Sequence, residues 1–371
     1  MSNIRSEITA GMGLITLDRP DALNALSLNM VRDLFILLTD WRDNPAVDAV
    51  AIRGSNKEGP FGAFCAGGDI RFFHSAGIAQ AEEEKQQLED FFTEEYRLNH
   101  LIFNYSKPYI AFMDGIVMGG GMGISQGASI RIVTERSKLA MPETNIGLFP
   151  DVGGGYFLSR CPGASGEYLA LTGQMLIGAD ALSLGLADTL ADSADIESLW
   201  SDLTTNPGLS IADRLEALKR NLAASTPVDH QPSWLDKSID FCFAKASVGE
   251  IFDSLAEQNS EWANNCIAAL RKRSPLMLHV VLEQIRRGRE MSLANDLRME
   301  RDLVRHCFYT KHLHRSGLTS ETVEGIRALA VDKDHSPKWN PGSIEQVTPD
   351  MVAPFFISPW SAEEHPLADL S

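Results

Sequence analysis

The chain has 371 residues, which is long enough to bury a sizeable core in one large domain with an appendage or in two domains. Hydrophobic residues make up 44% of the chain and charged residues 22%, and this balance excludes the disordered and collagen-like classes. Acidic residues outnumber basic ones by 50 to 33, and the resulting net charge of -17 argues against nucleic acid and anionic membranes as partners.

The cysteines and the N-terminus bear on the compartment. The 5 cysteines are widely spaced and include no C-x-x-C pair, so we expect neither a disulfide framework nor a zinc site. The N-terminus runs into an alternating segment, Ile8 to Leu17, and has neither a signal-peptide pattern nor an Arg-rich presequence. No apolar stretch approaches the roughly 20 residues that cross a bilayer. We therefore expect a cytoplasmic protein without a membrane span and without a bound metal.

Strand and helix patterns alternate in the first half of the chain. Leu14 to Leu17 is extended, and Ser27 caps a helical run with Met30, Leu34 and Trp41 on its apolar side. Short β-branched runs predict further strands at residues 47–52, 109–113 and 130–133. This alternation is typical of a layered α/β core.

From about residue 195 the strand signals fade and helical patterns dominate. The strongest begins at Ser274-Pro275, a cap followed by proline at the first helical position, with Leu278, Val281 and Ile285 on one stripe. Residues 192–233 are less regular, and we expect a linker among them. The sequence thus predicts a core over residues 1–191 and a mainly helical region over residues 192–371.

A glycine-rich turn at residues 64–70 follows one of these strands. Its small residues let backbone N–H groups approach a ligand closely, although an ordinary tight turn explains the same composition. The candidate binding residues of this turn are Cys65, Ala66, Gly67, Gly68 and Asp69.

A second glycine run at residues 118–123 follows the strand at 109–113 and opens a helix near Ser125. Amides at a helix N-terminus carry partial positive charge and can stabilise an oxyanion. Gly120 is a candidate catalytic residue of this run and Gly119 a candidate substrate-binding residue. Close packing of helix on strand is the alternative reason for the glycines. The spacing matches neither a dinucleotide-binding fingerprint nor a phosphate-binding loop.

Three carboxylates lie in apolar parts of the sequence, where burying a charge costs free energy. Glu143 and Asp151 lie in a largely apolar, glycine-rich segment, and Glu95 falls on the apolar face of a helical run. Burial and a neighbouring carboxylate both raise a carboxyl pKa, which suits acid and base work near neutral pH. Helix caps or ion pairs for Glu143 and Asp151, and an internal salt bridge for Glu95, remain open as alternatives.

Residues 123–127, Gly-Ile-Ser-Gln-Gly, match the nucleophile elbow G-x-S-x-G. That motif requires a strand ending at the serine, whereas the preceding glycines indicate that a helix has already begun. Ser125 is therefore a weak candidate nucleophile.

In this order, the motifs resemble the crotonase (enoyl-CoA hydratase/isomerase) superfamily, beginning at Leu17-Asp18-Arg19-Pro20. Within it, the chain is most similar to the 3-hydroxyisobutyryl-CoA hydrolases. The runs that carry this second resemblance are Glu94-Glu95-Tyr96, Met141-Pro142-Glu143, residues 147–158 and residues 332–339. The resemblance implies a spiral of ββα repeats followed by an α-helical C-terminal region, which completes the CoA site or forms oligomer contacts.

The same resemblance implies roles for the candidate residues. Two amides, of Cys65 or a close neighbour and of Gly120, form an oxyanion hole for the thioester oxygen. Glu143 attacks the carbonyl or activates a water, Asp151 orients that water or protonates the thiolate, and Glu95 binds a 3-hydroxyl group. CoA is part of the substrate, so no separate cofactor is expected.

Other functions remain open from the sequence. Hydratases of the superfamily place a glutamate where this chain has Gly123, so a two-glutamate hydration mechanism is incomplete. A lyase or isomerase of the same superfamily and a non-catalytic acyl-CoA binding protein are the alternatives to a hydrolase of valine catabolism. The acyl-CoA is the expected partner, and a homo-oligomer is left open.

Overall fold

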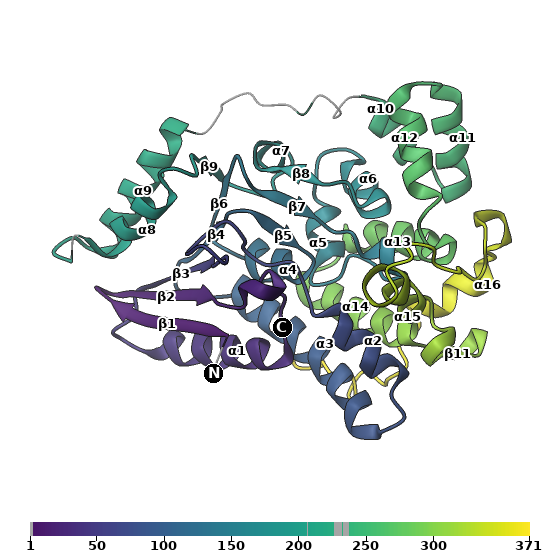
Figure 1. The fold of residues 1–371 in the computed structure, drawn as a ribbon, viewed down its shortest axis with the longest axis horizontal. Helices are drawn as coiled ribbons and strands as arrows, with labels where there is room; N and C mark the ends of the chain where they lie inside the picture. The colour runs from purple at the N-terminus through teal and green to yellow at the C-terminus, as the bar shows by residue number, and fades with distance from the viewer. Residues whose placement is uncertain (1–2, 206, 226–231, 233–236) are drawn as a thin grey trace. The chain divides into compact units, whose positions relative to one another are not determined.

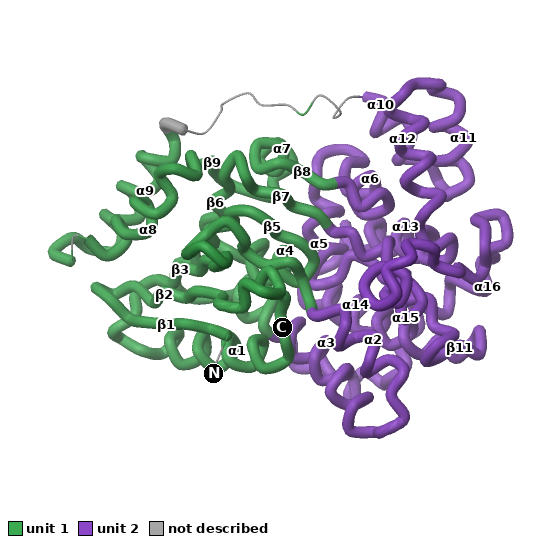
Figure 2. The backbone as a smooth tube through the Cα atoms, in the orientation of Figure 1, with its two compact units in different colours: residues 1–68, 98–140, 175–232 green, residues 69–97, 141–174, 233–371 purple. Residues whose placement is uncertain are grey.

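The computed structural model describes residues 3–205, 207–225, 232 and 237–371 (Figure 1). Contacts divide the chain into two compact units, each assembled from segments distant in sequence (Figure 2). Unit 1 contains residues 1–68, 98–140 and 175–232, and unit 2 contains residues 69–97, 141–174 and 233–371. The boundary expected at residues 191/192 falls inside unit 1, because the helices that follow it pack on the sheet of that unit.

Unit 1 is built on a six-stranded sheet in the order β1-β2-β3-β4-β6-β9. Only β1 is antiparallel to its neighbour. The strands are β1 (Ile4–Thr9), β2 (Met12–Leu17), β3 (Ala49–Gly54), β4 (Tyr109–Met113), β6 (Ile130–Thr134) and β9 (Thr189–Ala191). The four strands predicted from the sequence in this sheet are confirmed, with ends that shift by a few residues.

A second, three-stranded sheet consists of β5 (Ile116–Met118), β7 (Lys138–Ala140) and β8 (Leu176–Ile177). The chain passes from β4 directly into β5 and then into α4 (Gly120–Gln126), and it passes from β6 into β7. Each passage therefore adds one strand to each sheet, and the predicted spiral of ββα repeats is confirmed.

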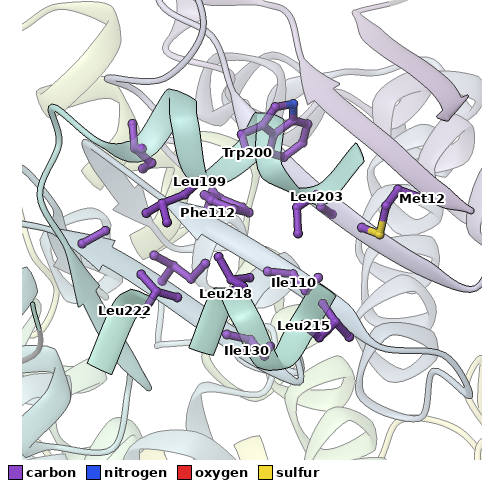
Figure 3. Packing of buried hydrophobic residues seen from close by; sticks show 14 of the residues in the cluster. Met12, Ile110, Phe112, Ile130, Leu199, Trp200, Leu203, Leu215, Leu218 and Leu222 are labelled. Carbon is purple, nitrogen blue, oxygen red and sulfur yellow. The ribbon is translucent and has the colours of Figure 1, made fainter. Parts of the chain in front are cut away.

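Two helices, α8 (Ile196–Thr205) and α9 (Ile211–Ser225), bury one face of the large sheet. Figure 3 shows Leu199 and Trp200 of α8 packed with Phe112 and Ile110 of β4. Parallel strands are usually covered on both faces, which is why their sequences are almost continuously apolar. Over these two helices the expectation of an irregular segment at 192–233 is wrong. Residues 206, 226–231 and 233 of the segment in which we expected a linker are outside the described part of the chain.

The opposite face of β2 receives α1 (Leu28–Asp43), which Ser27 caps as predicted by accepting from the Met30 N–H at 3.3 Å. A Cβ on Gly13 of β2 would lie 2.4 Å from the indole of Trp41. Only glycine at that position lets the indole lie so close to the strand. Unit 1 also contains α7 (Gly178–Ser183).

Unit 2 is mainly helical. Its α13 begins as predicted, since Ser274 accepts a hydrogen bond from the Met277 N–H at 3.2 Å. The helix α3 (Glu82–Phe103) starts in unit 2 and continues into unit 1 from Leu98. The other elements of unit 2 are α2 (Ile70–Ile78), α5 (Gly154–Leu158), α6 (Ser165–Thr172), α10 (Lys237–Phe243), α11 (Val248–Gln258), α12 (Glu261–Leu270), α13 (Pro275–Gly288), α14 (Leu293–Phe308), α15 (Glu321–Ile326), α16 (Pro349–Val352), β10 (Tyr309–Thr310) and β11 (Arg315–Ser316). None of the helices in the described ranges is long and apolar enough to cross a bilayer.

Replacing Trp200 by alanine should destabilise unit 1. The Trp200 ring lies 5.2 Å from the ring of Phe112 and 6.0 Å from the ring of Phe61. The Arg53 guanidinium lies 4.3 Å from the Trp200 ring. We expect Trp200→Ala to lower the free energy of unfolding by about 3 to 5 kcal/mol in urea titrations. The exposed Ile36→Ala on α1 is the control, and equal losses in both variants would contradict this account.

Candidate active site

Unit 2 buries three of the predicted site residues, Glu95, Glu143 and Asp151, which are 2%, 7% and 5% exposed. Glu95 lies on α3, Glu143 begins the 3-10 turn Glu143–Ile146, and Asp151 precedes α5. They influence one another electrostatically, since the charges of Asp151 and Glu143 both act on Glu95. The structure therefore brings the three predicted carboxylates together.

Burial is the main cause of their altered acidity. It raises the pKa of Glu95 well above its usual range, and Asp151 and Glu143 raise it further. Burial also raises the pKa of Glu143 well above its usual range, with Asp151 again adding to the rise, and raises the pKa of Asp151 to about 7. A group that exchanges protons near neutral pH, as Asp151 does, suits general acid and base catalysis.

The alternative explanations for these carboxylates find no support in the described residues. Oε1 of Glu95 and Oε2 of Glu143 are both buried without a hydrogen-bond partner there. A buried polar atom without a partner costs free energy, unless a ligand or water supplies one. Neither Glu95 in a salt bridge nor Glu143 as a cap accounts for this arrangement.

Tyr96 is a site residue that the sequence analysis did not single out. Its hydroxyl donates to Oδ2 of Asp151 at 2.9 Å, and this bond lowers the pKa of Asp151 against the effect of burial. The sequence held a signal, because Tyr96 continues the apolar stripe of α3 and a buried tyrosine hydroxyl usually has a partner.

The turn that carries Glu143 is held by α15 and by the C-terminal motif. Thr322 donates to the Gly147 carbonyl at 2.8 Å, and Gly147 itself is left-handed, with φ 64°. A Cβ on Gly147 would lie 2.6 Å from the Glu321 carbonyl oxygen and 3.1 Å from the Trp339 ring. Residues 332–339, one of the runs behind the family resemblance, thus contribute to the packing around Glu143.

The glycine-rich turn in unit 1 offers different amides from those expected. The Cys65 N–H donates to the Ile116 carbonyl at 2.9 Å, so it is not available as the predicted oxyanion donor. The N–H groups of Ala66 and Gly119 are also engaged, with the carbonyls of Leu23 at 3.0 Å and Ala140 at 3.3 Å. These three contacts form part of the pairing that holds the turn to its neighbours. The predicted binding residue Asp69 caps α2, where its side chain accepts from the Phe72 N–H at 3.3 Å.

Gly67, Gly68 and Gly120 have the available amides. In the part of unit 1 that the structure describes, their N–H groups have no hydrogen-bond acceptor. Gly67 is left-handed, with φ 100°, and a Cβ there would lie 3.6 Å from the Gly120 nitrogen. The two glycine runs therefore meet, and the prediction for Gly120 stands with Gly67 or Gly68 in place of Cys65.

Ser125 lies inside α4 and not at the end of a strand. Its hydroxyl is fully buried and donates to the backbone carbonyls of Gly121 at 2.8 Å and Met122 at 3.2 Å. The helix begins at Gly120, earlier than the expected start near Ser125. This geometry does not fit a nucleophile elbow.

The fold of this chain is shared with known proteins. A sequence profile of the enoyl-CoA hydratase/isomerase family matches residues 12–356. The chain belongs to this family. The fold of this chain is similar to that of a carnitinyl-CoA dehydratase from Mycobacterium thermoresistibile, with a TM-score of 0.85, 32% identity and 100% of both chains covered. An enoyl-CoA hydratase from Rhodobacter sphaeroides matches with a TM-score of 0.82 and 34% identity, over 96% of this chain and 98% of the other.

Curated relatives carry a different activity in their names. The chain is 41% identical to 3-hydroxyisobutyryl-CoA hydrolase, mitochondrial, of Danio rerio, over 96% of this chain and 90% of the relative. It is 38% identical to the Homo sapiens protein of that name, over 95% of this chain and 87% of the relative. The expectation of a cytoplasmic location is therefore wrong, because the names of these relatives place them in mitochondria.

Replacing Asp151 by asparagine should change how stability depends on pH. The folded-state pKa of about 7 lies above that of an unfolded aspartate, about 3.9, so wild-type stability falls as the pH rises between these values. From pH 5 to pH 8, wild type should therefore lose about 2 to 3 kcal/mol of unfolding free energy that Asp151→Asn does not lose. Urea titrations at both pH values measure this.

Asp40→Asn, which removes an exposed carboxylate from α1, is the control for the loss of one charge. A gain for Asp151→Asn that is the same at pH 5 and pH 8 would contradict the raised pKa of Asp151.

Proposed function

We propose that the chain hydrolyses the thioester of a short branched 3-hydroxyacyl-CoA. The proposed substrate is 3-hydroxyisobutyryl-CoA, and the products are 3-hydroxyisobutyrate and CoA. The observation that carries this proposal is the buried Glu143, which has one unpartnered oxygen and lies close to Asp151. The names of the curated relatives, at 38–41% identity over nearly the whole chain, support the same reaction.

Glu143 has the central role in this proposal. It either attacks the thioester carbonyl carbon or removes a proton from a water that does so. In both cases one water is consumed, the carbon–sulfur bond breaks and the thiol of CoA leaves. A carboxyl group with a raised pKa and a free oxygen suits either step.

Asp151 and Glu95 support the reaction from the same cluster. Asp151, with a pKa of about 7, can orient the water or give a proton to the departing thiolate. The unpartnered Oε1 of Glu95 would bind the 3-hydroxyl group of the substrate. A site built to bind a hydroxyl discriminates strongly against acyl groups that lack one, because its polar group is then left unpaired.

The amides of Gly120 and of Gly67 or Gly68 stabilise the oxyanion in this proposal. Gly120 is the first residue of α4, so its N–H also carries the partial positive charge of a helix N-terminus. Backbone donors at fixed positions need no rearrangement when negative charge develops on the thioester oxygen.

The second candidate is a lyase, which the printed names of the two similar solved structures favour. The helix α4, with the sequence GGMGISQ, contains no carboxylate, and Gly123 occupies the position of the first glutamate of hydratases. This absence favours hydrolysis, for which a single catalytic glutamate is enough.

CoA is part of the proposed substrate, and we propose no separate cofactor. The net charge of -17 would repel its phosphates, so binding depends on local amides and individual Lys or Arg residues. Contacts of residues 192–371 with CoA, or between copies in a homo-oligomer, remain part of the proposal.

The test is CoA release from 3-hydroxyisobutyryl-CoA, followed with a thiol reagent. We expect Glu143→Ala to lower kcat by about 10²- to 10⁴-fold, as for the loss of a catalytic acid or base. Ser125→Ala is the control and should release CoA at the wild-type rate. Hydration of crotonyl-CoA by wild type without any CoA release would reject the hydrolase and favour the lyase.

The oxyanion role of Gly120 can be tested by deleting its N–H. Proline is tolerated at the first helical position, so Gly120→Pro removes the donor where a helix can accept it. We expect kcat for CoA release to fall by about 10²- to 10³-fold, whereas Gly120→Ala, which keeps the N–H, should retain most activity. Equal losses in the two variants would indicate a steric effect and argue against the oxyanion role.

A further inference from the structure

The loop that carries Asp151 has an unfavourable backbone conformation. Val152 and Gly153 are both left-handed, with φ of 56° and 88°. A β-branched residue rarely adopts positive φ, and such a conformation persists only where the surroundings hold it. Something outside the loop must therefore fix the turn that follows Asp151.

Two helices of unit 2 hold this turn. Glu300 of α14 accepts hydrogen bonds from the N–H of Gly153 at 2.8 Å and of Gly155 at 3.0 Å. Gln284 of α13 donates to the Pro150 carbonyl at 2.6 Å and to Glu300 at 3.2 Å. Both side chains are fully buried. The residues on either side of Asp151 are thus fixed by side chains more than 130 positions away in the sequence.

A second carboxyl group, Asp296, lies one turn before Glu300 and accepts from the Tyr156 N–H at 2.9 Å. A Cβ on Gly155 would lie 2.3 Å from Oδ1 of Asp296, and one on Gly288 would lie 2.3 Å from the Gly155 carbonyl oxygen. The loop therefore packs against α13 and α14 with no room for a side chain at either glycine.

Holding a short helix does not by itself require this pair of carboxyl groups. Burial raises the pKa of Asp296 to about 7 and that of Glu300 well above its usual range, so keeping both groups in the interior is costly. A single Ser or Asp cap would satisfy the first amides of a helix at the surface. The charge of Asp151 also acts on Glu300, which indicates that the two groups are close.

We propose that Glu300 is a positioning residue for Asp151: by binding the amides of Gly153 and Gly155, it fixes the left-handed turn that sets the direction of the Asp151 carboxyl group. The proposal rests on the proposed thioester hydrolysis, in which Asp151 handles the water or the leaving thiolate. Glu300 itself is not a catalytic residue.

The first experiment compares Glu300→Gln with Glu283→Gln. In Glu300→Gln one oxygen becomes an NH₂ group that faces a backbone N–H, and the turn loses an acceptor. Displacement of a catalytic group can cost on the order of 100-fold, so we expect kcat for CoA release to fall by about that factor while KM is unchanged. Glu283 of α13 is 42% exposed, and its variant should behave as wild type.

The second experiment asks whether Glu300 acts through Asp151. In an Asp151→Asn background, Glu300→Gln should cause little further loss of kcat, because the group that it positions is already gone. Independent losses that multiply in the double variant would overturn the proposal, as would a fall in stability without a change in kcat.

Amide hydrogen exchange in residues 151–157 gives a readout that does not need activity. It should accelerate in Glu300→Gln and stay at the wild-type rate in Glu283→Gln; an unchanged rate in Glu300→Gln overturns the proposal. If wild type releases no CoA from any thioester, the proposed function fails, and the exchange experiment still decides whether Glu300 holds the turn.

If Glu300→Gln does not fold, Gln284→Met removes the contacts to Pro150 and Glu300 without changing the charge. It should show the same separation of kcat from KM and the same faster exchange; wild-type values of both would overturn the proposal.

Discussion

Burying three carboxyl groups together is the constraint on which the rest of unit 2 depends. No Lys or Arg of the described residues forms an ion pair with Glu95, Glu143 or Asp151. Without a cation, such groups hold protons more tightly than in water and are stabilised only by hydrogen bonds of suitable direction. The Tyr96 hydroxyl is one such bond. Placing these three carboxyl groups close together lowers the stability of the fold. Chemistry at the site explains why the protein nevertheless keeps them together.

The same constraint explains the helices around the cluster. A carboxyl group can act on a thioester only if its backbone holds it in place, and both turns concerned contain left-handed residues, Gly147 and Val152. The first packs on α15, and the second is bound by Gln284 and Glu300. The helical region thus supplies rigidity that the short connections carrying Glu143 and Asp151 lack.

Strands and helix caps that depend on neighbouring residues could be predicted from local patterns in the sequence. The strand at residues 109–113 and the cap at Ser274 depend on neighbours in the chain, and both are confirmed. The helix α8 was not singled out within the region expected to be helical, although Ile196, Leu199 and Leu203 repeat at helical spacing, because polar residues around that stripe resemble a linker.

Contacts between residues far apart in the chain could not be predicted from a single sequence. The carboxylates could be recognised from their apolar surroundings, so the prediction that they form a buried group was accessible. The bond from Cys65 to Ile116 spans about 50 residues, and nothing near Cys65 reveals that its amide is engaged. The Glu300 bond to Gly153 spans 147 positions and has no local signal.

The contact of Trp339 with Gly147 has a consequence for the synthesis of the protein. Every carboxyl group of the cluster is encoded before residue 152, yet the turn that carries Glu143 packs against the indole of Trp339, which is made about 190 residues later. A growing chain on the ribosome therefore carries the reactive side chains long before it can hold them in place. The packing around Glu143 is therefore completed only when translation of the chain is nearly finished.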